Sequence, residues 1–276
     1  MCDIMNFRDI ATIALLKIAR FATRGSGDIE KIYYSVDRLG FLWLIIMRAM
    51  TLLKIDQEIL VPAGSKLVPI PLLMSSSERE VLHIFKPKPS ETVVDVGTYY
   101  GRYTLLASKY VGDAGLVVGV EADFDNYCIV KKNVEKAKAR NVLLIRSAAS
   151  NHEGTIKLYK TERPGTPSIV WDARSKYVTV QCKTIDSLLR EYNVAKVDWL
   201  KIDVEGAELM VLEGCKRTIA ENERLKLLVE IHTPSNEVHK FLKKLSFQIT
   251  YLEQNEQIPY HILASKSARF VDILGG

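Results

Sequence analysis

Acidic, basic and imidazole side chains stand close together in two short stretches of this 276-residue chain. The first stretch contains Lys201, Asp203 and Glu205, and the second contains Glu230 and His232. Each begins as an apolar, β-branched run typical of a buried strand, where unpaired charge is costly. Side chains two apart in a strand share a face, so the two sets would meet if the strands are neighbours. Such a group could remove a proton, orient an acceptor or bind a metal ion.

Each of these side chains has more than one interpretation. His232, with an ordinary pKa near 6.5, is a candidate general base, or else a hydrogen-bonded core residue. Lys201 would hold the acids ionised or contact an anionic acceptor. Asp203 and Glu205 are candidate acceptor ligands, although Asp203 could instead cap the helix that follows and Glu205 could favour its dipole. Whether a metal is bound stays open.

A third polar stretch, VVDVGTYYGRYT, covers residues 93–104 and reads as strand, glycine turn and helix. Gly97 permits a tight turn, and Gly101 lets the helix start close to a ligand. The two glycines are four residues apart with Tyr99 between them, so the dinucleotide fingerprint is missing. Asp95, Thr98 and Tyr99 complete this loop.

Small and acidic residues follow the next two predicted strands. Glu121, followed by Ala122, could accept hydrogen bonds from both hydroxyls of a ribose, and Ser147 and Ala148 are small enough for an adenine to lie against. In parallel sheets ligands bind outside the carboxyl ends of the strands. The set predicts a ribonucleoside ligand and argues against NAD, which needs a glycine beside its pyrophosphate. S-adenosylmethionine (SAM) suits these residues better, because it has ribose and adenine but no phosphate.

The strands that position these residues begin at residue 91. Apolar runs cover 92–96, 116–121, 141–146, 197–203 and 225–232, with helical patterns at 102–111, 125–139, 207–220 and 235–245. This alternation predicts a parallel sheet buried on both faces. Runs at 247–253 and 259–265 predict an antiparallel edge pair. Strands at 154–160 and 177–182 and a short helix at 184–192 form an insertion before the fourth core strand.

The first ninety residues carry less information. Residues 1–57 hold two apolar helical patterns and predict a helical extension, the second being cut by Arg48 before it could span a bilayer. These helices are expected to pack on the main domain or on a second subunit, with a peripheral membrane contact as the alternative. Residues 58–90 predict a hairpin and a lead-in helix, before a main domain at 91–276.

Composition limits the class of protein. The net charge of +5 is far below the concentrated basic load of a dedicated nucleic-acid binder, without excluding one. The four cysteines lack zinc-like spacing, and acids and arginines interrupt the N-terminus where a secretory signal would be apolar. We therefore expect reduced thiols and a cytoplasmic protein, membrane-associated if the N-terminal helices rest on a bilayer.

Four motifs resemble the FkbM-type methyltransferases, a SAM-dependent group. They are VVDVGTYYGRYT, VVGVEAD, AASNHEGTIKLY and KIDVEGAELMVLEG, and the similarity runs from about Glu78 to about Ala264. The resemblance implies an α/β, Rossmann-like sheet of seven mostly parallel strands with an antiparallel edge strand and helices on both faces. It implies methyl transfer from SAM, typically to a hydroxyl of a sugar, a lipid-linked compound or another small molecule.

The resemblance also implies roles for individual residues. Asp95, Gly97 and Gly101 would line the methionine end of SAM, Glu121 would bind the ribose, and Ser147 and Ala148 would neighbour the adenine. The chain departs from the family at Thr98 and Tyr99, where a small residue and an asparagine are usual. Tyr99 would stack on the ligand, point into solvent or narrow the pocket.

Three functions follow from these patterns. The first is an O-methyltransferase for a glycan, polyketide-like or lipid-linked hydroxyl, with residues 162–175 as a candidate lid. The second is an RNA methyltransferase, because a lysine with two acids resembles a ribose-methylating arrangement. The third is a binding protein without activity, in which Tyr99 has closed the SAM site.

Overall fold

The computed structural model describes residues 58–60, 67–69, 81–82, 84–160, 168–170, 176–252 and 258–266. The chain divides into two compact units, residues 1–82 and residues 83–276, and each is described by itself. In the first unit, strands β1 (Glu58–Leu60) and β2 (Leu67–Pro69) pair antiparallel, as the hairpin prediction requires. The predicted helices of residues 1–57 and most of the lead-in helix lie outside the described residues.

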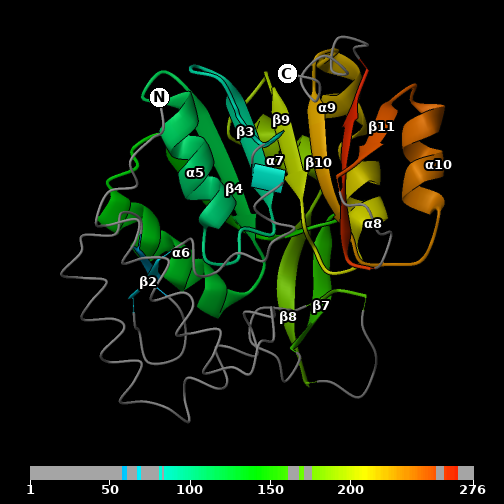
Figure 1. The fold of residues 1–276 in the computed structure, drawn as a ribbon. Helices are drawn as coiled ribbons and strands as arrows, with labels where there is room; N and C mark the ends of the chain where they lie inside the picture. The colour runs from blue at the N-terminus through cyan, green and yellow to red at the C-terminus, as the bar shows by residue number, and fades with distance from the viewer. Residues whose placement is uncertain are drawn as a thin grey trace, which may run out of the picture. The chain divides into compact units, whose positions relative to one another are not determined.

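A seven-stranded sheet forms the centre of the second unit, in the order β11-β12-β10-β9-β3-β4-β5 (Figure 1). Its strands are β3 (Thr92–Val96), β4 (Leu116–Glu121), β5 (Val142–Arg146), β9 (Trp199–Ile202), β10 (Lys226–Ile231), β11 (Gln248–Tyr251) and β12 (Tyr260–Ser265). Strand β12 runs antiparallel to both of its neighbours, and the pairs from β10 through β9, β3 and β4 to β5 are parallel. The predicted sheet and its antiparallel edge pair are confirmed.

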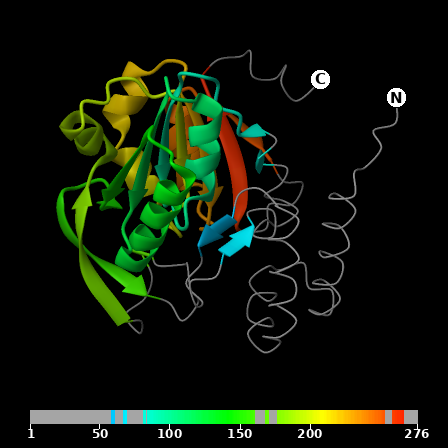
Figure 2. The ribbon, with the colours of Figure 1, turned by 90° about the vertical axis from the view of Figure 1, so that its left-hand side faces the viewer.

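Helices cover both faces of this sheet (Figure 2). Helices α5 (Arg102–Val111) and α6 (Phe124–Ala137) follow β3 and β4, while α7 (Ile185–Glu191), α8 (Glu208–Glu213), α9 (Lys216–Glu221) and α10 (Glu237–Lys244) belong to the second half. The chain steps from β3 to β4 to β5 in one direction and from β9 to β10 in the other. Because such crossovers are right-handed, the two halves place their helices on opposite faces. Among the described residues, no helix is both long and apolar enough to cross a membrane.

Apolar side chains between sheet and helices form the core. Val94, Val118, Leu200 and Val229 are fully buried on four neighbouring strands. Each strand is a nearly continuous β-branched or leucine-rich run because both of its faces are covered. Polar residues interrupt these runs mainly toward the carboxyl ends of the strands.

A three-stranded sheet stands apart from the central one (Figure 1). Strands β7 (Gly154–Lys160) and β8 (Lys176–Lys183) pair antiparallel, and β6 (Ala148–Ala149) runs parallel to β8. This is the insertion expected before the fourth core strand. Its base contacts the core closely, because a Cβ atom at Gly214 would lie 2.0 Å from the carbonyl oxygen of Ser150.

The single helix predicted over residues 207–220 is wrong: the structure has α8 and α9, with Gly214 and Cys215 between them. Asp186 at the start of α7 explains the break. Its carboxylate accepts the backbone N–H groups of Arg217 and Thr218, both at 2.8 Å, and so satisfies the donors that a new helix start leaves unpaired.

Candidate active site

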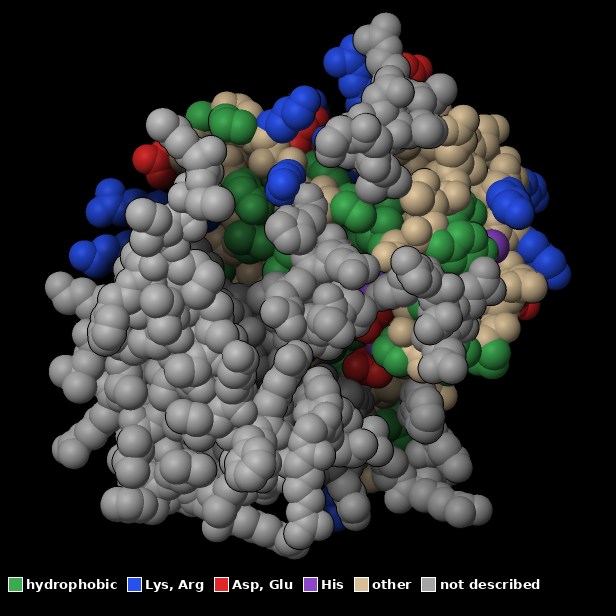
Figure 3. Space-filling view, viewed as in Figure 1, with side chains coloured by type: hydrophobic (Ala, Val, Ile, Leu, Met, Phe, Trp, Pro, Cys, Tyr) green, Lys and Arg blue, Asp and Glu red, His purple; other side chains and the backbone are tan. Residues whose placement is uncertain are grey.

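The carboxyl ends of five parallel strands meet at one edge of the sheet. Strands β3 and β9 are neighbours there, with Asp95 opposite Lys201 and Val96 opposite Ile202. The strand order reverses between them, which is where open α/β sheets bind ligands. Acidic side chains with histidine beside them are visible near the middle of the face drawn in Figure 3.

The glycine turn after β3 is held tightly against the loop after β9. Gly97 has φ +79°, and a Cβ atom there would lie 1.8 Å from the carbonyl oxygen of Asp203. Gly101 has φ +89°, and its Cβ would lie 2.6 Å from Cγ2 of Val130 on α6. Gly101 is therefore required by its backbone conformation and by packing against α6, which the ligand-based interpretation of this glycine did not anticipate.

Tyr99 occupies the middle of the turn in a left-handed conformation with φ +52°. Its ring stacks on the ring of Tyr100, with centroids 3.4 Å apart and an interplanar angle of 28°. Stacking on a protein ring was not among the three orientations considered for Tyr99.

Glu121 ends strand β4 with its carboxylate buried. Oε2 accepts the backbone N–H of Tyr99 at 2.8 Å, and Oε1 accepts that of Asp123 at 2.9 Å. Burial raises the pKa of Glu121 from 4.5 to about 7, although both backbone donors act in the opposite direction. Oε2 also accepts the Thr98 hydroxyl at 3.4 Å. Because a carboxylate has about four acceptor sites, these bonds leave capacity for one hydroxyl of a ribose.

The small residues after the next strand lie beside Glu121. Ser147 and Ala148 are both buried, and the N–H of Ser147 donates to the carbonyl oxygen of Glu121 at 3.0 Å. Ala122 is half-buried and precedes Asp123, whose carboxylate caps α6 by accepting the N–H of Asp125 at 2.9 Å. The structure thus brings the predicted ribose and adenine residues to one corner of the sheet edge.

A buried ion pair network joins β3 and β9. Nζ of Lys201 lies 3.3 Å from Oδ1 of Asp95 and 3.1 Å from Oδ2 of Asp203, and it donates to the carbonyl oxygen of Gly97 at 3.1 Å. Burial alone would lower the pKa of Lys201, but the carboxylates of Asp203 and Asp95 outweigh it and raise that pKa. Burial opposes ionisation of Asp203 as well, yet Lys201 and then His232 hold the pKa of Asp203 well below its usual range.

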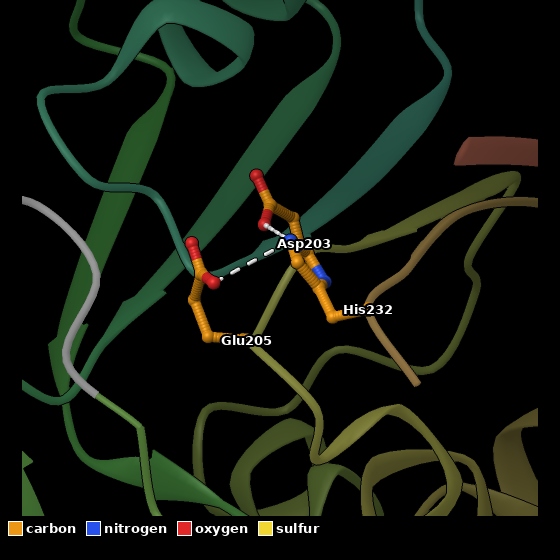
Figure 4. Close-up of side chains that lie close together, drawn as sticks. All are labelled: Asp203, Glu205 and His232. Atoms are coloured by element: carbon orange, nitrogen blue, oxygen red, sulfur yellow. Dashed lines mark ion pairs between the residues drawn. The ribbon is translucent and has the colours of Figure 1, made fainter. Parts of the chain in front are cut away.

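His232, directly after β10, lies among four carboxylates. Its Nε2 is 3.9 Å from Oδ1 of Asp203, 3.6 Å from Oε2 of Glu205 and 3.8 Å from Oε1 of Glu230, and its Nδ1 is 2.9 Å from Oε1 of Glu208. Figure 4 shows three of these side chains converging from the ends of β9 and β10. Strands β9 and β10 are neighbours, so all five residues of the two polar stretches come together, as the sequence predicted.

The pKa values of two groups in this cluster are strongly shifted. Burial would lower the pKa of His232, but the bond to Glu208 and the charges of Asp203 and Glu205 raise it to about 9. Burial raises the pKa of Glu205 to about 7, with His232 acting against the shift and Asp203 adding to it. Perturbed groups of this kind gather at functional sites.

The structure decides one structural alternative and adds residues that the sequence did not suggest. Asp203 does not cap α8, whose first residue follows Ala207 with no side-chain cap. Thr104 donates to Oδ2 of Asp95 at 2.6 Å, and Glu208 contacts His232. The sequence could have indicated Glu208, because it is an acid at the start of an otherwise apolar helical turn.

Of the candidate lid, only Ser168, Ile169 and Val170 are described, and the Ser168 hydroxyl donates to the carbonyl oxygen of Glu205 at 2.6 Å.

A sequence model of the family described as Methyltransferase FkbM domain matches residues 95–254, which include every strand end described above. The chain belongs to the FkbM methyltransferase family. Its use of SAM as methyl donor follows, and the protein is a SAM-dependent methyltransferase.

Similar proteins include two named methyltransferases. Methyltransferase sdnD of Sordaria araneosa is 26% identical over 193 residues, covering 57% of this chain and 74% of that protein. The hexuronic acid methyltransferase AglP of Haloferax volcanii is 27% identical over 187 residues, covering 65% of this chain and 74% of that protein. Among solved structures, a precorrin-6y C5,15-methyltransferase of Geobacter metallireducens GS-15 superposes with a TM-score of 0.48 at 12% identity, covering 75% of this chain and 94% of that one.

Proposed function

We propose that this FkbM methyltransferase methylates a hydroxyl oxygen of a sugar-containing or other small polyhydroxylated acceptor. SAM supplies a methyl group already activated on a sulfonium. The protein must then align the acceptor and take up its proton. The observation that carries the proposal is the cluster of Asp203, Glu205, Glu230 and His232 at the ends of β9 and β10, beside the glycine turn of β3.

An aliphatic hydroxyl is a weak acid, so its methylation benefits from a nearby proton acceptor or positive charge. Three carboxylates lie within 3.9 Å of His232 Nε2, and Asp203 and Glu205 are partly open to solvent with side chains 25% and 30% exposed. They are thus accessible to an acceptor while being held by Lys201 and His232. Preorganised groups of this kind lower barriers without rearranging during reaction.

The residues predicted to bind SAM are compatible with a methyl donor bound beside this cluster. Asp95, Gly97, Thr98, Tyr99 and Gly101 would surround the methionine end and Glu121 would bind the ribose, with Ala122, Ser147 and Ala148 beside the adenine. Glu121 supports this arrangement because it is buried at a strand end and yet keeps acceptor capacity. The closest approach of the two loops, at Gly97 and Asp203, would then separate the donor side from the acceptor side.

Two further observations favour a sugar over a nucleic acid. The similar protein of Haloferax volcanii is named for methylation of a hexuronic acid. The acceptor side of the site also carries several carboxylates around Lys201 and His232, and this excess of negative charge would repel the phosphates of RNA.

The proposal is tested by incubating the full chain with SAM labelled with ¹³C on the methyl group and with sugars, glycans and polyketide-type alcohols. Carbon NMR of the product distinguishes methyl groups on oxygen, nitrogen and carbon. We expect an O-methyl signal, which Asp203→Asn abolishes and the exposed control Glu223→Gln retains. Transfer only to nitrogen or carbon would refute O-methylation, and transfer only to an RNA tested in parallel would refute the small-molecule acceptor. SAM binding without any transfer would point to a binding protein.

A further inference from the structure

We propose that Asp203, Glu205 and His232 form a binding site for one divalent cation that accepts mixed nitrogen and oxygen ligands. The cation's role toward an acceptor hydroxyl rests on the function proposed above, whereas its binding does not. The three side chains come from the ends of two adjacent strands and converge on one point (Figure 4).

The distances are near those that a metal ion requires. One ligand atom of each residue lies within 4.8 Å of the others. Nε2 of His232 is 3.6 Å from Oε2 of Glu205 and 3.9 Å from Oδ1 of Asp203. Neighbouring ligands at about 2.1 Å from an octahedral ion stand about 3.0 Å apart, so side-chain rotations would have to close the site. Glu205, with a side chain 30% exposed, has room for such a rotation.

The histidine is already oriented as a metal ligand. Its Nδ1 contacts Oε1 of Glu208 at 2.9 Å, and Glu208 is only 1% exposed. This contact leaves Nε2 facing Asp203 and Glu205. Metal-binding histidines usually donate their other ring N–H to a carboxylate, which fixes the tautomer and the ring orientation. Glu208 stands outside the three ligands and supplies this contact independently of them.

The local charge also favours a cation. Nε2 of His261 lies 3.4 Å from Oε2 of Glu230. Lys201 is engaged by Asp95 and Asp203, which leaves His232 facing the remaining carboxylates. The acids around these two side chains are Asp95, Asp203, Glu205, Glu208 and Glu230. Buried or half-buried negative charge without compensation is costly. A divalent ion would compensate it.

The ligand set indicates the class of ion. Two carboxylates and one imidazole are harder than the nitrogen- and sulfur-rich sets of structural zinc sites and softer than the all-oxygen sets of calcium. Mn²⁺ accepts such mixed ligands and leaves positions open. An acceptor hydroxyl bound there would be acidified, and its proton would pass to Glu230, which lies beside His232 but outside the three ligands.

The test is a titration of the full chain with Mn²⁺ alone, followed by electron paramagnetic resonance, which reports free ion. We expect one bound Mn²⁺ per chain, and at least tenfold weaker binding in Glu205→Gln and in His232→Gln. The exposed control Glu223→Gln should bind as the wild type does. Affinity for S-adenosylhomocysteine, measured on every variant, should stay unchanged and shows that each variant is folded.

Two results would overturn the inference. In the first, the chain binds S-adenosylhomocysteine but leaves millimolar Mn²⁺ free. In the second, folded Glu205→Gln and His232→Gln bind Mn²⁺ as tightly as the wild type, which would place the ion elsewhere. Since the titration contains neither SAM nor acceptor, its outcome is separate from that of the methylation assay.

Discussion

Oε1 of Glu208 lies 2.9 Å from Nδ1 of His232 and 2.8 Å from the backbone nitrogen of Gly206. A single buried oxygen thus connects the end of β10 to the loop after β9. The two polar stretches that the sequence predicted to meet are thus joined by a residue outside both.

Glu208→Ala should disturb the acceptor side of the site while sparing SAM. Without the carboxylate, His232 loses its orienting partner, and loss of such a partner typically lowers metal affinity or activity by about 10- to 100-fold. Glu208→Gln keeps an oxygen for the N–H of Gly206 and for Nδ1 and should be milder. Turnover, Mn²⁺ affinity and SAM affinity are measured in parallel. Equal loss of SAM affinity would make Glu208 a general structural residue.

Glu121→Gln should weaken SAM binding by about tenfold to a hundredfold, because hydrogen bonds to a charged group contribute about 1.5–3 kcal/mol. Glu121→Ala should in addition lower the melting temperature, because the N–H groups of Tyr99 and Asp123 would lose their acceptor. Calorimetric titration with SAM and scanning calorimetry separate the two effects. Unchanged affinity in Glu121→Gln would remove this residue from the ribose site.

The stability of the ligand-free protein should depend on Glu121 and on pH. Its folded pKa of about 7 exceeds 4.5, so its contribution is present below pH 4.5 and is lost as pH rises through 7. The difference corresponds to about 3 kcal/mol. Glu121→Gln cannot ionise at this position and does not lose this stability. The unfolding free energy of Glu121→Gln minus that of the wild type should therefore increase between pH 5 and pH 8, as urea titrations would measure. A constant difference would contradict the prediction.

Gly97→Ala should destabilise the protein far more than Gly112→Ala. Both glycines have positive φ, a backbone conformation that costs other residues about 1–3 kcal/mol. A Cβ at Gly97 would also lie 1.8 Å from the carbonyl oxygen of Asp203, whereas one at Gly112 meets nothing within 4 Å. Urea unfolding of both variants provides the comparison. Similar losses would mean that the two loops separate easily.

Asp203→Asn should reduce turnover by about 10²- to 10⁴-fold, the range expected for loss of a group that handles protons. SAM affinity should change much less, because Asp203 faces Lys201 and His232. Steady-state kinetics together with direct SAM titration distinguish these effects. Wild-type turnover in Asp203→Asn would exclude Asp203 from the mechanism.

The sequence was most informative where a short run of residues defines an element and the order of the strands then brings their ends together. Strands such as β3 and β10 are apolar runs of the right length, and the parallel order of β9 and β10 brings Asp203 and His232 to one edge. The same logic grouped Glu121 with Ser147, since β4 and β5 are neighbours.

Contacts between distant elements could not be predicted in the same way. The break between α8 and α9 depends on Asp186, which lies more than thirty residues before its partners Arg217 and Thr218. The bond from Thr104 to Asp95 requires the exact placement of α5 on the sheet. Nothing in the local sequence of either helix specifies these partners, because the determining atoms belong to other elements.

The tight contact of Gly214 with the carbonyl oxygen of Ser150 has a consequence for protein engineering. Ser150 follows β6, and Gly214 ends α8, so the contact attaches the base of the three-stranded sheet to the core. A chimera that exchanges β7 and β8 between related enzymes should therefore have its junctions after Ser150 and before Thr184, so that the contact is kept. If Ser150 were exchanged as well, the residue at position 214 would have to remain a glycine.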